Sequence, residues 1–275
     1  MSKKERESNL LAVRSSLNVI LQDNNRTRII GTGSGVMIRF SNRFFFCTVE
    51  HNIEQNNNKV AILTGKREGD IAITVQPYEL SFLKQTRLKE FTAEELTKVI
   101  GNVDTIKPLD VAFAETQELN LLQERNTITT SDGLTLEIDA GYKNVVDLEQ
   151  VDLIKKNARY SFAGRVKSEI NAEGQYSFEE TIVTGIKLVD MDDHIIRFDL
   201  GRPIGNHRRF EGCSGAPILD KNGNLVALLK GGDKNVESCY IYGFRLDRLK
   251  AYIKITYFNP SLDVAMDLPP QKLPA

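Results

Sequence analysis

Residues 210–220, FEGCSGAPILD, place Ser214 between small residues, directly before a proline and an apolar run. Gly212 and Gly215 flank the serine on both sides. Glycine adopts tightly curved backbone conformations that other residues resist, so this composition predicts a sharp turn before a strand. Such a turn either contains a serine by chance or holds the Ser214 hydroxyl in position for a chemical role. Residues elsewhere in the chain help to decide between these two interpretations.

The overall composition is that of an ordinary globular protein without a strong charge bias. Of the 275 residues, 41% are hydrophobic and 27% are charged, and the formal net charge is -1. A chain of this length can bury a large core and fits one large or two small domains. Because the charges balance, the sequence predicts no nucleic-acid partner and no membrane partner.

The cysteines and the first residues indicate the compartment. Cys47, Cys213 and Cys239 are too few and too far apart in the sequence for a disulfide framework or a zinc site. The start of the chain, MSKKERESNL, lacks the apolar core of a secretory signal. No apolar run approaches the roughly 20 residues that span a bilayer. These features predict a cytoplasmic protein without a metal or another cofactor.

Residues 4–22 carry apolar side chains at helical spacing, which predicts one N-terminal helix. The apolar stripe packs onto the body of the protein in one interpretation, and it docks a regulatory protein partner in the other. After this segment, short strand-like stretches alternate with turn signals. A helical insertion interrupts them, where Thr92 and Glu95 form a capping box.

Many short strands of this kind predict an all-β fold with two similar units and a cleft between them. The predicted organisation is an N-terminal helix at 1–26, a first strand-rich unit at 27–139, an irregular acidic connection at 140–157, a second strand-rich unit with a closing helix at 158–258, and a loose tail at 259–275.

A serine hydroxyl becomes a good nucleophile only when a base accepts its proton, and the chain has 3 histidines. His51 follows the apolar stretch FFFCTVE, where a strand would hold it rigidly. His194 lies in a polar turn and is interpreted as a surface residue. His207 lies in a basic loop close to Ser214 and is a minor candidate for contact with a substrate. His51 is therefore the first candidate for the base.

A third group must orient the imidazole, and a carboxylate serves this purpose. Asp110 in LDVAFAE comes directly before an apolar strand and is the first candidate, with Asp104 as the second. In the simpler interpretation Asp110 is an ordinary turn residue after Pro108. The order His51, Asp110, Ser214, each at the edge of an apolar strand, favours the chemical interpretation.

Three segments and their order resemble the chymotrypsin-like, or trypsin-like, serine peptidases. GTGSGVMIRFSNRFFFCTVEH is similar to the Gly-rich hairpin that leads to the family's TAAH strand end. LDVAFAE is similar to the DVAL strand, and GCSGAPILDKNGNLVAL is similar to GDSGGPLV and the hairpin after it. The resemblance covers about residues 27–250 and implies two packed six-stranded antiparallel β-barrels with the active site between them.

The resemblance also implies a metal-independent serine endopeptidase that acts on protein or peptide substrates. His51 would be the general base, Asp110 would orient its imidazole, and Ser214 would attack the scissile carbonyl. The backbone N–H groups of Gly212 and Ser214 would form the oxyanion hole. The family's aspartate before the serine is Cys213 here, and no IVGG-type start is present, which makes the chain more similar to intracellular and bacterial members.

Two other functions stay open at this point. Cys213 could be the nucleophile of a cysteine hydrolase, although side-chain alternation turns it away from the direction of Ser214. Alternatively, the barrels could form a protein-binding module in which the triad is idle.

The family's substrate pocket is built from residues just before the serine turn and from the strand ALLKGG. Here these places carry Arg208, Arg209, Lys230 and Gly231. The local positive charge predicts a preference for an acidic or polar residue before the cleaved bond. In the simpler interpretation, these basic side chains extend into solvent.

Overall fold

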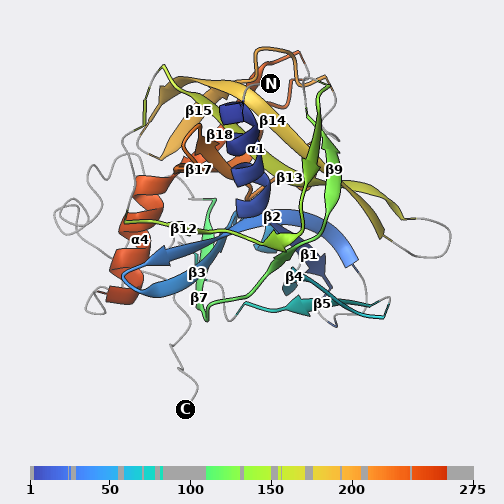
Figure 1. Cartoon of the computed structure of the whole chain (residues 1–275). Helices are drawn as coiled ribbons and strands as arrows, with labels where there is room; N and C mark the ends of the chain where they lie inside the picture. The colour runs from blue at the N-terminus through green and yellow to red at the C-terminus, as the bar shows by residue number, and fades with distance from the viewer. Residues whose placement is uncertain are drawn as a thin grey trace.

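A computed structural model describes most of the chain, and strands dominate it (Figure 1). The described residues are 3–23, 25, 29–54, 59–69, 71–77, 81–82, 110–130, 133–149, 154–155, 157–170, 176–192, 194–205, 210–235 and 237–258. The predicted helical insertion, Asp104 and the predicted tail from residue 259 lie outside these ranges.

The elements follow one another as the strand-rich pattern predicts. The first half of the chain contains α1 (Lys3–Ser15), β1 (Leu17–Gln22), β2 (Ile29–Phe40), β3 (Arg43–Thr48), α2 (His51–Glu54), β4 (Lys59–Glu68), β5 (Ile71–Val75), β6 (Ser81–Phe82) and β7 (Ala112–Thr116). The middle contains β8 (Leu122–Gln123), β9 (Asn126–Thr129), β10 (Thr135–Ile138), β11 (Gly141–Tyr142) and β12 (Val145–Asp147). The last part contains β13 (Arg159–Ile170), β14 (Tyr176–Met191), β15 (Ile195–Asp199), β16 (Pro217–Asp220), β17 (Leu225–Gly232), β18 (Tyr240–Arg245) and α4 (Leu246–Phe258).

The first unit is an 8-stranded sheet in the order β5-β4-β1-β2-β3-β7-β6, with β12 paired to β2. The long strand β2 pairs with β1 through its first part and with β3 through its second part. A strand that changes partners in this way forms a corner between two layers of sheet. The His51 candidate follows β3, and the Asp110 candidate precedes β7, which is the next strand in the sheet.

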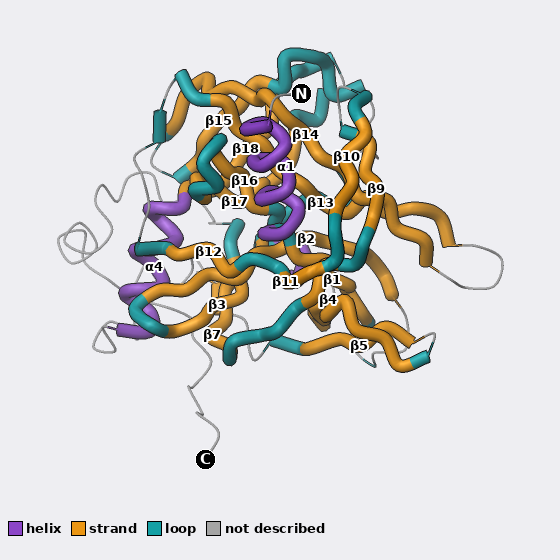
Figure 2. Tube along the Cα trace, viewed as in Figure 1, coloured by secondary structure: helices purple, strands orange, loops and turns teal. Residues whose placement is uncertain are grey.

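The second unit is a closed six-stranded barrel in the order β13-β14-β15-β18-β17-β16, as predicted for this half of the chain. Antiparallel pairing of β13 with β16 closes the ring. Phe162, Ile186 and Phe198 are fully buried in its core. Figure 2 shows the strands of this barrel above those of the first unit. Among the described strands, only this second unit forms a closed ring.

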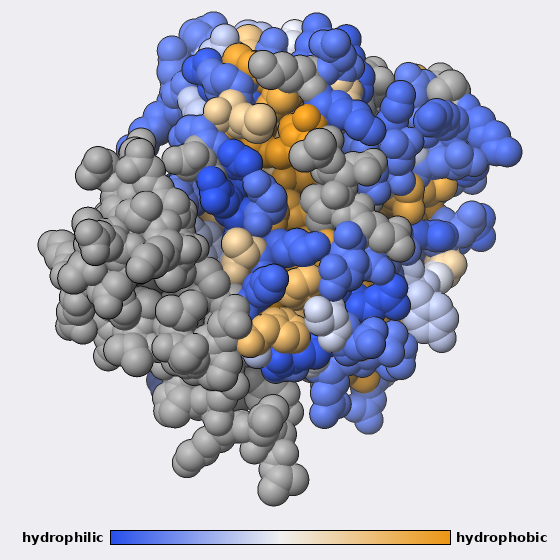
Figure 3. Space-filling view, turned by 90° about the vertical axis from the view of Figure 1, so that its left-hand side faces the viewer, coloured by the Kyte–Doolittle hydropathy of each residue, from blue (hydrophilic) through white to orange (hydrophobic). Residues whose placement is uncertain are grey.

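A shared apolar core holds the two units together. Its buried members include Val36, Phe45 and Phe113 of the first unit and Leu228, Phe244 and Tyr252 of the second unit and α4. On the face turned to the viewer in Figure 3, hydrophilic residues predominate around a central group of hydrophobic ones. The continuous core sets the position of one unit relative to the other.

The predicted N-terminal helix is wrong in its second half. The helix α1 ends at Ser15, and the next residues form strand β1, which lies between β2 and β4. The run LNVIL in β1 is almost entirely buried. A strand that is buried on both faces lacks apolar–polar alternation, so its sequence resembles part of an apolar helix. Pairing with distant strands decides its conformation.

The helix α1 itself packs against β13, β14 and β16 of the second unit (Figure 2). Of the apolar stripe, Val13 is 2% exposed and belongs to the shared core, and Leu10 and Leu11 pack against that core. The structure therefore shows the packing interpretation of the stripe for these side chains. A regulatory partner at this helix stays a prediction.

The predicted irregular connection at 140–157 also contains regular structure. β11 pairs with β8, and β12 pairs with β2 in parallel. These strands are so short that they leave no periodic pattern in the sequence. Among the described residues, no helix is long and apolar enough to cross a membrane.

Lys143 in this connection caps the C-terminal end of α1. Its ammonium donates hydrogen bonds to the carbonyls of Val13 and Ser16 at 2.9 and 2.8 Å. The last carbonyls of a helix lack partners within the helix, and a cation beside them also suits the helix dipole. Burial lowers the pKa of Lys143 to about 8.

We predict that the free energy of unfolding rises between pH 8 and pH 10.5 because of Lys143. Its folded-state pKa of about 8 lies below the ordinary value of 10.5, so the unfolded chain binds more protons than the folded chain across this range. Stability therefore increases with pH there. Urea denaturation should show a smaller increase for Lys143→Met than for the wild type or for Lys66→Met, which changes an exposed lysine. Equal increases in all three proteins would contradict the assignment.

Candidate active site

His51 and Asp110 are brought together by the pairing of β3 with β7. Thr48 pairs with Ala112, so the end of β3 lies beside the start of β7. Nδ1 of His51 lies 2.7 Å from Oδ2 of Asp110, and the backbone N–H of His51 donates to Oδ1 at 2.9 Å. The carboxylate therefore holds both the ring and the main chain of the histidine, which leaves Nε2 of the ring for another partner.

The Asp110 carboxylate is stabilised in its charged form. Its side chain is only 14% exposed. Burial opposes the charge, but hydrogen bonds and charge from His51, together with the Lys230 ammonium, outweigh burial and lower the pKa of Asp110. An ionised Asp110 accepts a hydrogen bond from Nδ1–H and so favours the tautomer whose Nε2 can accept a proton from a nucleophile.

The turn around Ser214 has the sharp backbone that its glycines predict. Gly212 and Gly215 have φ values of 94° and 91°, a region that residues with side chains rarely adopt. A Cβ at Gly212 would overlap with the carbonyl oxygen of Arg165, and one at Gly215 would overlap with that of Ser34. Both backbone conformation and close packing therefore require glycine at these positions.

Two backbone amides of the same turn take no part in its internal hydrogen bonds. The carbonyl of Cys213 accepts a hydrogen bond from Ala216 N–H at 2.9 Å, and the Ser214 N–H of the same planar peptide points the opposite way. Cys213 N–H and Gly215 N–H donate to other carbonyls. The N–H groups of Gly212 and Ser214 donate to no residue that the structure describes. These are the two groups predicted for the oxyanion hole.

Lys230 links Ser214 to the His51–Asp110 pair. The Ser214 hydroxyl donates to the Lys230 carbonyl at 3.4 Å, and the Lys230 ammonium lies 3.9 Å from Oδ2 of Asp110. Within the described residues, no hydrogen bond joins the Ser214 hydroxyl to His51. The side chain of Asn52, next to His51, donates to the Ser214 carbonyl at 3.0 Å. Through Lys230 and Asn52, the Ser214 turn therefore lies beside the His51–Asp110 pair.

Cys213 is not a candidate nucleophile, so the cysteine hydrolase alternative is wrong. The residue is 0% exposed within the core of the second unit. Burial raises the pKa of its thiol to about 12. A cysteine in this environment stays protonated and out of reach of a substrate. Ser214, the next residue, is half-buried, whereas Cys213 is fully buried.

The structure describes only some of the other histidines and predicted substrate-binding residues. Nε2 of His194 lies 3.1 Å from the hydroxyl of Tyr252, so His194 is a half-buried packing residue and not a free surface group. His207, Arg208 and Arg209 lie outside the described residues. Lys230 is directed to Asp110, a role that neither interpretation of its sequence position predicted. Among the described residues other than its chain neighbours, no atom lies within 4 Å of the place that a Cβ on Gly231 would take.

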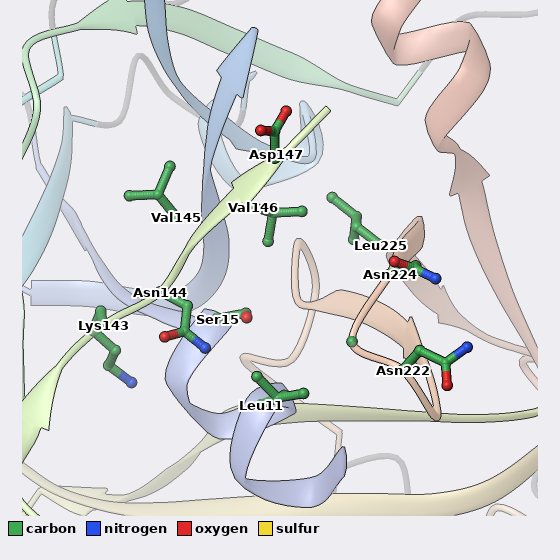
Figure 4. A pocket seen from close by; sticks show the side chains of 11 residues that line it. Leu11, Ser15, Lys143, Asn144, Val145, Val146, Asp147, Asn222, Asn224 and Leu225 are labelled. Carbon is green, nitrogen blue, oxygen red and sulfur yellow. The ribbon is translucent and has the colours of Figure 1, made fainter. Parts of the chain in front are cut away.

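Two hollows in the described part of the chain are not lined by the triad candidates. One of about 480 Å³ lies between α1, β12 and the turn before β17 (Figure 4). Another, of about 580 Å³, is lined mainly by β9, β14 and residues 202–204. Among the described residues, no group of His, Cys, Asp or Glu side chains could hold a metal ion. The candidate site is therefore identified by its hydrogen bonds and backbone geometry.

We predict that Gly215→Ala destabilises the protein more than Gly133→Ala. Both glycines have positive φ, which costs about 1–3 kcal/mol for a residue with a side chain. Among the described residues, a Cβ at Gly133 meets no atom within 4 Å, whereas one at Gly215 overlaps with Ser34 and Thr48. Urea denaturation of the two variants measures the difference. Equal losses would show that the turn does not pack against Ser34 as described.

Comparison with known proteins supports the fold. No protein-family model matches the chain, and no curated protein matches its sequence. The scabies mite inactivated protease paralogue S-D1 matches with a TM-score of 0.53 and 11% identity, over 95% of this chain and 97% of that chain. Human heparin binding protein matches with a TM-score of 0.52 and 14% identity, over 98% and 96%.

Similarity at these identities concerns the fold alone. One of the two matched proteins is itself described as an inactivated protease, so the fold does not establish an activity. The resemblance implied two packed six-stranded barrels: the second unit is such a barrel, whereas the described strands of the first unit form an 8-stranded sheet. The chain has the chymotrypsin-like serine protease fold.

Proposed function

We propose that the protein is a serine endopeptidase that cleaves protein or peptide substrates through an acyl-enzyme intermediate. The observation that carries this proposal is the His51–Asp110 pair, joined at 2.7 Å, in one site with Ser214 and its turn. The candidate residues retain the three side-chain types that the chemistry needs.

In the proposed mechanism, Oγ of Ser214 forms a bond to the scissile carbonyl carbon while its proton passes to Nε2 of His51. Asp110 keeps the imidazole in place and stabilises the positive charge on it. The carbonyl oxygen becomes negative and accepts hydrogen bonds from the N–H groups of Gly212 and Ser214. The C–N bond then breaks as His51 donates the proton to the departing amine. Water releases the acyl group by an equivalent attack.

A binding module on the same fold is the second candidate. The observation that favours it is the hydrogen bond from the Ser214 hydroxyl to the Lys230 carbonyl at 3.4 Å, which leaves the hydroxyl turned to the main chain. In hydrolases without substrate, catalytic hydrogen bonds are often long or misaligned and tighten on binding. The endopeptidase therefore stays the better-supported function.

We predict that a fluorophosphonate probe labels the wild-type protein on Ser214. Ser214→Ala should abolish labelling, since the probe reacts with an activated serine. Asp110→Asn should slow labelling by roughly 10⁴-fold, because the neutral amide supports the wrong tautomer of His51. Cys213→Ala should leave labelling intact, because the thiol is buried. The labelled peptide and the rate are measured by mass spectrometry.

The same experiment separates the two candidate functions. A folded wild-type protein that is not labelled would favour the binding module. Labelling that survives Ser214→Ala would place the nucleophile elsewhere and overturn the assignment of the site.

A further inference from the structure

Asn52 lies between the two units with both hydrogens of its amide engaged. The residue follows His51 in α2 and is only 4% exposed. Its Nδ2 donates to the Ser214 carbonyl at 3.0 Å and to the Thr48 hydroxyl at 3.2 Å. One acceptor therefore belongs to its own unit, and the other belongs to the candidate nucleophile of the opposite unit.

The peptide after Ser214 is held on both sides. Its carbonyl accepts hydrogen bonds from Asn52 and from Ser34 N–H, the latter at 2.9 Å. A carbonyl oxygen has two lone pairs, so both are used. The N–H of the same peptide, on Gly215, donates to the Leu229 carbonyl at 2.7 Å. Because the peptide is planar, these bonds set its orientation and the position of the Ser214 Cα.

Asn52 belongs to a buried network of hydrogen bonds that continues to the serine turn. The Thr48 hydroxyl donates to the Ser34 carbonyl at 2.7 Å, and the Ser34 hydroxyl donates to the Gly212 carbonyl at 2.8 Å. Ser34 and Thr48 are 0% exposed. Buried networks whose members are all hydrogen-bonded rigidify the structure around them. The first unit therefore holds the serine turn at Gly212 and at Ser214.

We propose that Asn52 is a positioning residue that sets the alignment of His51 and Ser214. The inference rests on the proposed function of the site. Asn52 directly follows His51 in the chain, and its side chain is hydrogen-bonded to the Ser214 carbonyl. It therefore connects the element that carries the base with the element that carries the nucleophile. A side chain without two donors on one nitrogen could not bridge Thr48 and Ser214 in this way.

Gly33 provides a test that leaves residue 52 unchanged. A Cβ at Gly33 would lie 2.7 Å from Nδ2 and 3.0 Å from Cγ of Asn52. Gly33→Ala therefore displaces the end of the Asn52 side chain. Gly31→Ala is the matched control on the same strand, because its Cβ would meet Leu21 at 3.2 Å and not Asn52.

The experiment compares the full-length wild type with Asn52→Ala, Gly33→Ala and Gly31→Ala. Steady-state kinetics with a peptide ester should show kcat lower by about 10- to 100-fold in the first two variants, since a small misplacement of reacting groups costs this much. KM should stay within about threefold, because the substrate contacts are unchanged. Amide hydrogen exchange by NMR should be at least about tenfold faster at Gly215. Gly31→Ala should leave kcat and the exchange at Gly215 near wild-type values.

Three results would overturn the proposal. The first is that Asn52→Ala and Gly33→Ala both keep the wild-type kcat and the wild-type exchange rate at Gly215. The second is that exchange becomes faster throughout the protein and kcat falls only in proportion to the loss of global stability, which would make Asn52 a purely structural residue. The third is that Gly31→Ala changes kcat and the exchange at Gly215 as much as the two test variants do. If the wild type is not labelled by a fluorophosphonate, the proposed function fails, and exchange at Gly215 alone decides whether Asn52 holds the turn.

Discussion

The close approach of the Ser214 turn to strand β2 is the contact on which the site depends. Gly215 packs so tightly against the Ser34 carbonyl that no side chain fits there, and its φ of 91° suits glycine. This approach brings the Ser214 carbonyl within reach of Ser34 N–H and the Asn52 amide. Asn52 and Ser214 are 162 positions apart in the chain, so the packing of the two units creates the site.

The carboxylate of Asp110 is the negative group of this site, and both His51 and Lys230 lie near it. Its Oδ2 lies 2.7 Å from Nδ1 of His51 and 3.9 Å from the Lys230 ammonium. A neighbouring cation favours the ionised carboxylate, which in turn favours the tautomer of His51 needed in a base. Lys230 therefore supports the ionised carboxylate in addition to supplying a carbonyl to Ser214.

More of the candidate site than of the surrounding fold could be predicted from the sequence. Local backbone geometry restricts which residue types can occur, and this makes two features visible in the sequence. They are the glycines beside Ser214 and the strand ends before His51 and after Asp110. Strand β1 was predicted as helix because burial on both faces removes the alternation that identifies a strand. The contact of Lys230 with Asp110 and the bridge made by Asn52 depend on tertiary packing. The only available signal for Asn52 was a polar residue directly after the candidate base.

We expect the base of the first unit and the nucleophile of the second unit to act together on one substrate group. A crystal structure of the fluorophosphonate adduct would show whether they do. We expect phosphorus bonded to Oγ of Ser214, the phosphoryl oxygen accepting hydrogen bonds from the N–H groups of Gly212 and Ser214, and His51 still paired with Asp110. A phosphoryl oxygen directed away from both amides, or a His51 ring separated from the adduct, would contradict it.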